Sequence, residues 1–121
     1  MIEYREEPNS NIAEIIINGP VSKHDYDIVC DRLVALIEQK GRIRLLEDIR
    51  EIGKFDLSII PADIRFSFHH LKDMSHCAVV GERAWLEWLT KVLDPLLRCK
   101  VRYFERDDIE AARIWLRDDP D

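Results

Sequence analysis

This sequence of 121 residues lacks several features that mark large classes of protein. It contains no apolar run of about 18 residues, so no transmembrane helix is readable. Glutamates precede the first apolar stretch, which is not the pattern of a signal peptide. Its three cysteines, Cys30, Cys77 and Cys99, are odd in number and widely spaced, which gives no disulfide framework. We therefore expect reduced, buried thiols in a cytoplasmic protein.

An excess of basic residues is also missing. The chain has 18 lysines and arginines against 24 acidic residues, and its net charge is −6. The basic residues are scattered and do not form the patch that nucleic-acid binding requires, so no nucleic-acid partner is expected. The length suits one domain, 1–121, that buries a core without disulfides or metals.

Apolar periodicity predicts the first half of the fold. Alternation in 2–5 and an apolar run in 12–17 are separated by a Pro-Asn-Ser turn, which predicts a β-hairpin with an edge strand first. Ser22 and Asp25 resemble a capping box at the start of a helix that Gly41 ends. Residues 42–49 predict a strand whose C-terminal end carries Glu47 and Asp48.

The central feature is an apolar run, Cys77 to Val80, that passes through Gly81 into an amphipathic helix. The run predicts a strand buried on both faces. The apolar positions of the helix span roughly 160°, wider than the ~100° stripe needed to cover a sheet. The sheet alone cannot cover this arc, so the helix needs a second packing partner. The apolar positions are Trp85, Leu86, Trp88, Leu89, Val92 and Leu93.

A second unusual region lies between Glu47 and Lys72. Its first part is apolar for a loop, through Phe55, Leu57, Ile59 and Ile60, and it follows the carboxyl end of a predicted parallel strand, where ligands gather. Pro61 predicts the start of a helix that runs to about Lys72. This helix has two apolar faces, and the second carries Ala62, Phe66 and His70.

The C-terminal part predicts a short strand, Val101 to Phe104, and a helix capped by Asp107 or Asp108. That helix is anchored by Ile109, Ala112, Trp115 and Leu116. The order ββαβαβαβα predicts a single α/β domain with a mostly parallel sheet, one antiparallel edge strand and helices on both faces.

The motifs together resemble the SpoIIAA-like family, relatives of the STAS domains of anti-sigma factor antagonists. The resemblance rests on Gly19 with Ser22 and Asp25-Tyr26, on the segments 41–46 and 63–70, on 78–81 with Trp85, and on 101–104 and 111–116. It spans nearly the whole chain. The resemblance implies a STAS-like α/β domain without established catalysis, in a family thought to bind apolar ligands or touch membranes through the second and third helices.

One departure separates the chain from the anti-sigma factor antagonists. They carry a phosphorylatable serine just after an aspartate at the end of the third strand, whereas here Asp48 is followed by Ile49 and Arg50. Ser58 is the first hydroxyl residue after Asp48 and lies ten positions later. The pattern of a phosphoserine switch is therefore missing from this position.

Chemical sites are weaker alternatives. His69, His70, His76 and Cys77 suggest zinc, but adjacent helical histidines diverge by about 100°. Cys77 as a nucleophile has only His76 as a candidate positive neighbour, and strand alternation sends His76 to the other face. Glu47 and Asp48 face opposite sides of a strand and cannot act together as an acid–base pair. We expect no metal and no cofactor. An enzyme that uses His70 with a nearby acid is the least favoured reading.

Two functions remain open. The first is a non-enzymatic binding module whose second and third helices admit an apolar small molecule or a lipid surface, with the protein cytoplasmic and peripheral to the membrane. The second is a protein-interaction module of the partner-switching kind, which uses the same rim. The candidate contacts are Phe55, Leu57, Ile60, Phe66, His70, Trp85, Trp88 and Leu89.

Overall fold

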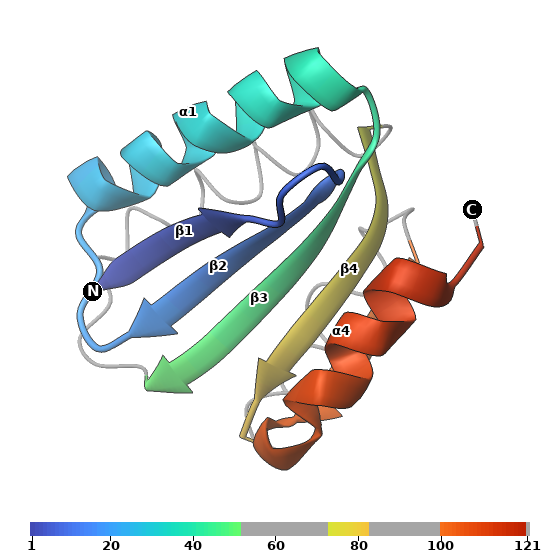
Figure 1. Cartoon of the computed structure of the whole chain (residues 1–121). Coiled ribbons are helices and arrows are strands. Elements are labelled where there is room, and N and C mark those ends of the chain that lie inside the picture. The colour runs from blue at the N-terminus through green and yellow to red at the C-terminus, as the bar shows by residue number, and fades with distance from the viewer. Residues whose placement is uncertain (52–72, 83–99, 121) are drawn as a thin grey trace.

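The computed structural model describes residues 1–51, 73–82 and 100–120 (Figure 1). A five-stranded sheet has the order β1-β2-β3-β4-β5, in which β1 is antiparallel to β2 and the remaining pairs are parallel. This confirms the predicted α/β class and the antiparallel edge strand. The elements are β1 Ile2–Glu6, β2 Ile12–Asn18, α1 Lys23–Lys40, β3 Ile43–Glu51, β4 Met74–Gly81, β5 Lys100–Glu105, η3 Arg106–Asp108 and α4 Ile109–Asp118.

The helices predicted for 61–72 and for the segment after Gly81 fall in 52–72 and 83–99, outside the described residues. Among the described residues, the helical elements are α1, α4 and the short 3-10 turn η3. None of these helices is long and apolar enough to cross a bilayer.

Local signals place the hairpin and the first helix where the sequence predicts them. Asn9 adopts a φ of 57° in the β1–β2 turn, a left-handed conformation that asparagine tolerates. The Ser22 hydroxyl accepts a hydrogen bond from the Asp25 backbone N–H, so it caps α1. Gly41 ends α1 with a φ of 83°.

Strand alternation gives the sheet two separate cores. Leu45 and Val79 point to the side of α1 and pack with Val29 and Leu33. Leu46 and Val80 point to the other side and pack with Leu116 of α4. The two helices therefore cover opposite faces, as predicted, with α1 lying toward β1 and α4 toward β4 and β5 (Figure 1).

Three predictions about boundaries and burial need correction. β3 continues two residues past Ile49, to Glu51, because Glu51 pairs with Asn18 and its carbonyl accepts from the Gly19 N–H. Asp108 occupies the N-cap position of α4 but makes no capping side-chain bond, since the preceding 3-10 turn leaves it at φ −102°, ψ 19° and not in the extended geometry of a cap. Cys30 is only partly buried, whereas Cys77 is buried.

Candidate functional site

Asp48 is the polar side chain that defines the carboxyl edge of the parallel sheet. It pairs in register with Ile16 on β2 and Val80 on β4, so it lies within the sheet and not beyond the strand end. It is 1% exposed, and its Oδ2 accepts a hydrogen bond of 3.0 Å from Arg50 Nε. Its Oδ1 is buried and accepts no hydrogen bond from the described part of the chain. Removal of Arg50 would leave the buried Asp48 carboxylate without a compensating charge, which is strongly destabilising.

Arg106 joins the ends of the neighbouring strands at the same edge. Its Nη2 donates to the Ile49 carbonyl at 2.7 Å, and its Nε lies 3.7 Å from Glu82 Oε1. The arginine after β5 thus contacts the end of β3 and the residue after β4. The exposed surface here carries both signs of charge, through Arg50, Glu51, Glu82 and Arg106. Such a mixed edge suits recognition of a polar protein surface better than capture of an anion.

The amino edge of the sheet carries a second polar cluster, around His76. The register places Arg44, His76 and Lys100 in one row on the α4 side. His76 Nε2 lies 2.9 Å from Asp119 Oδ2, and Lys100 Nζ donates to the same oxygen at 3.1 Å. These two hydrogen bonds, that from His76 first, lower the pKa of the Asp119 carboxyl below its ordinary value of 3.8.

His76 is fully buried, and its second ring nitrogen is also engaged. Nδ1 lies 2.8 Å from Ser75 Oγ. Because a carboxylate only accepts, Nε2 is the donor to Asp119, and the Ser75 hydroxyl can serve Nδ1 as either donor or acceptor. The Trp115 ring packs edge-on at 5.2 Å, and Arg102 lies 5.6 Å from the same indole.

Ser75, His76 and Asp119 form the hydrogen-bonded series of a hydrolytic triad, but the burial of Ser75 and His76 argues for a structural role. Ser75 is 5% exposed and His76 0%. A nucleophilic hydroxyl must reach a substrate carbonyl beside an oxyanion hole, and this hydroxyl lies inside the sheet core. The cluster instead fastens the end of α4, where Arg44 Nη1 also donates to the Leu116 carbonyl at 2.7 Å.

The structure describes some of the residues that the sequence suggests for a metal site or an acid–base pair. His76 lies in the α4-side row and Cys77 in the α1-side core, so the predicted alternation is confirmed. Glu47 and Asp48 likewise fall on opposite faces. No group of histidine, cysteine and carboxylate residues in 1–51, 73–82 and 100–120 is arranged to hold a metal ion.

All eight predicted contact residues lie in 52–72 and 83–99, outside the described residues. The structure describes the strands that these segments join, β3, β4 and β5. The missed features are the Asp48–Arg50 pair and the Asp119 contact with His76. The sequence does indicate the Asp48–Arg50 pair, because residues two apart on a strand lie on the same face. A contact across 43 residues, as for the second, has no local signal.

Comparison with solved structures places the fold. The chain is similar to an uncharacterised protein of the DUF3478 family with a SpoIIAA-like fold from Shewanella loihica PV-4, with a TM-score of 0.77 and 21% sequence identity. The match covers 96% of this chain and 92% of that chain. At this identity it shows the fold alone.

The family follows from the sequence model. A family model described as SpoIIAA-like matches residues 12–117, so this chain belongs to the SpoIIAA-like family. The comparison with curated proteins found no significant match.

Proposed function

We propose that this protein is a non-catalytic binding module that takes up an apolar small molecule or a lipid surface. The contacts come from the two segments that connect β3 to β4 and β4 to β5. They are the apolar and aromatic residues Phe55, Leu57, Ile60, Phe66, Trp85, Trp88 and Leu89, together with His70.

The observation that carries the proposal is the apolar α1-side surface of β4 and β5. Cys77 and Val101 form one cross-strand pair on this side, and Val79 and Tyr103 form the next. α1 itself packs mainly against β1 and β3, at the other half of the same face (Figure 1). Cys77 and Val79 are buried in the same apolar cluster as Val29 and Leu33 of α1, whereas Val101 and Tyr103 of β5 are only partly buried against it. The β5 end of this face is therefore where a further apolar partner would lie.

Topology favours the two connecting segments for that role. The chain steps from β2 to β3 to β4 to β5 in one direction across the sheet, and α1 is the first of these crossovers. Right-handed crossovers made in the same direction lie on the same face, so the next two would follow α1. The wide apolar arc around Trp85 and Trp88 and the second apolar face at Phe66 would then exceed what the sheet alone can cover.

A protein-interaction module is the second candidate, and the charged carboxyl edge favours it. Arg50 and Arg106 are fixed by Asp48 and by the Ile49 carbonyl, which presents them in defined positions. Preorganised charges of both signs give specificity toward a protein partner.

Vesicle flotation tests the first candidate against the second. Wild type, Phe66→Ala and Trp88→Ala are mixed with neutral and with anionic vesicles, and Ile114→Ala serves as the control because this side chain is 55% exposed on α4, across the sheet. With a net charge of −6, binding must come from apolar burial and should survive added salt. Wild type and the control should float, and the two variants should not.

Melting curves complete the test. If the aromatic site is only partly filled by protein, Phe66→Ala and Trp88→Ala should each cost less than the ~3–5 kcal/mol of a fully packed aromatic. Full-size destabilisation, together with a wild type that neither floats nor carries a ligand in a native mass spectrum, would show that both residues belong to the core. The protein-interaction candidate would then stand ahead.

A further inference from the structure

β1 leaves one side of its backbone open. It forms an end of the sheet and pairs with β2, and no other described strand pairs with its outer side. The side chains of Glu3 and Arg5 are 42% and 60% exposed and form an ion pair of 3.2 Å within the strand, whereas Ile2 and Tyr4 are partly buried. An edge of this kind presents unpaired backbone N–H and C=O groups to another strand.

Two hydrogen bonds at the ends of β1 show which backbone groups face outward. The Asn18 N–H donates to the Met1 carbonyl, and the Glu7 N–H donates to the Ile12 carbonyl. The β1–β2 register runs without a bulge between these points. Because backbone direction alternates at each residue, the odd-numbered residues of β1 face β2 and the even-numbered ones face outward. The outward set is Ile2, Tyr4 and Glu6.

We propose that a second copy of this chain occupies the edge, with the two β1 strands paired antiparallel about a two-fold axis at Tyr4. In this register Tyr4 exchanges backbone hydrogen bonds with Tyr4 of the partner subunit, and Ile2 does so with Glu6 of the partner subunit. All three outward residues are then paired, and the two sheets become one continuous sheet. The arrangement is isologous and closes as a dimer.

Charge complementarity selects this register. Glu3 lies opposite Arg5 of the partner subunit, at a non-hydrogen-bonded position where facing side chains are closest. Arg5 also neighbours Glu14 on β2, and Glu14 lies 3.2 Å from Arg113. Charges therefore alternate in sign along one row, from Arg113 through Glu14 and Arg5 to Glu3 of the partner subunit. Opposite charges at facing positions stabilise a strand pair, and like charges destabilise it.

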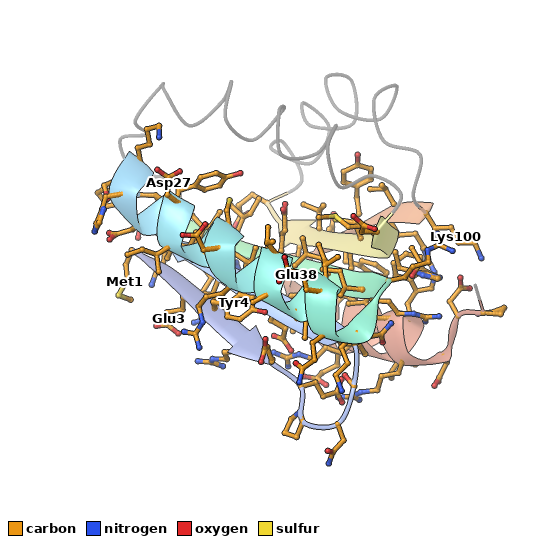
Figure 2. All side chains as sticks on the ribbon, turned by 90° about the horizontal axis from the view of Figure 1, so that it is seen from above. Met1, Glu3, Tyr4, Asp27, Glu38 and Lys100 are labelled. Carbon is orange, nitrogen blue, oxygen red and sulfur yellow. The ribbon has the colours of Figure 1, made fainter. Side chains whose placement is uncertain are left out.

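The α1 side of the edge adds apolar area. Tyr4 lies beside α1 in Figure 2, and the Arg32 guanidinium is 5.1 Å from the centre of its ring. Ile28 lies one turn before Arg32 on the same side of α1 and is 48% exposed. The two α1 helices would lie on the same face of the joined sheet, so association would remove part of the exposed Ile28 surface from water.

On the opposite face, α4 packs mainly against β3, β4 and β5, and its Arg113 and Arg117 side chains reach Glu14 on β2 and Glu7 after β1. The proposal is independent of the proposed ligand site.

Charge reversal of the full chain tests the dimer by sedimentation velocity over a concentration series. Arg5→Glu and Glu3→Arg each place like charges in two facing pairs and should weaken association about tenfold or more. The double variant E3R/R5E restores opposite charges and should restore the dimer. Arg42→Glu, at an exposed site before β3, matches the change in net charge of Arg5→Glu and should leave association unchanged.

A backbone variant supplies an independent readout. Glu6→Pro removes an outward N–H but no hydrogen bond to β2, so it should keep the wild-type circular dichroism and abolish association. The proposal is overturned if the wild type stays monomeric at the highest concentration reached. It is equally overturned if a dimer forms whose strength ignores the single reversals, or if the double variant fails to recover it while remaining folded.

Discussion

Val79→Asp is the substitution that most directly probes the sheet core. Val79 is 6% exposed in β4, and its register neighbours are Glu47 on β3 and Tyr103 on β5. The change removes roughly 1.5–3 kcal/mol of apolar burial. It also places a carboxyl group in a dry core, at a cost of several kcal/mol.

The sum approaches the whole stability of an ordinary domain, about 5–15 kcal/mol, so the variant should be largely unfolded at neutral pH. Val79→Ala, which only deletes methyl groups, should remain folded with a lower midpoint. A buried carboxyl group has a raised pKa, so the folded variant binds its proton more tightly than the unfolded chain does. Any folded Val79→Asp protein should therefore become more stable as pH falls toward 5 and less stable as pH rises.

Far-ultraviolet circular dichroism and urea titration at two pH values measure both effects. Ile114→Asp is the matched control, because the same carboxyl group then enters a side chain that is 55% exposed. A Val79→Asp protein with the wild-type midpoint at neutral pH would refute the placement of β4 at the centre of a packed sheet.

Two further substitutions test the polar clusters. Asp119→Asn should lower the melting midpoint at neutral pH, because His76 and Lys100 lower the pKa of the Asp119 carboxyl and so stabilise the fold while the carboxylate is charged. The difference in midpoint between the variant and wild type should therefore shrink as pH falls below 3.8. An unchanged difference at acid pH would contradict the contact. Arg50→Ala should lower the free energy of unfolding measured in urea by about 2 kcal/mol, because it leaves the buried Asp48 carboxylate unpaired. The same substitution should lower it by less in an Asp48→Asn background. Equal losses in both backgrounds would contradict the pair.

The parts of the fold that the sequence predicts well are those set by neighbouring residues. The cap at Ser22 and the stop at Gly41 depend on one hydroxyl and one positive φ, and both are local. The buried strand from Cys77 was predicted from four apolar residues, although it begins earlier, at Met74. The polar residues Ser75 and His76 do not look like part of a buried strand in the sequence. They are buried because their polar groups bond to each other and to Asp119.

The parts that the sequence does not predict depend on distant pairing. Arg50 and Glu51 look like the start of a loop, yet β3 includes them because β2 is long enough to pair with Glu51. Arg113 reaches Glu14 across 99 positions, which no local pattern encodes. The eight candidate contacts of the ligand site stay predictions, since they lie outside the described residues.

Ion pairs connect α4 to the sheet and to the β1–β2 turn. Arg113 contacts Glu14 on β2, and Arg117 Nε lies 3.2 Å from Glu7 in the β1–β2 turn. Together with the Asp119 contacts, these pairs fasten α4 along its length over Ala112 and Leu116, both 0% exposed. To open this face would expose that core and separate charges that lie at both ends of the sheet. The α4 face is therefore tied to β2, to β4 and to the β1–β2 turn. Under the proposed function, a rearrangement that admits an apolar ligand would lie on the side of α1.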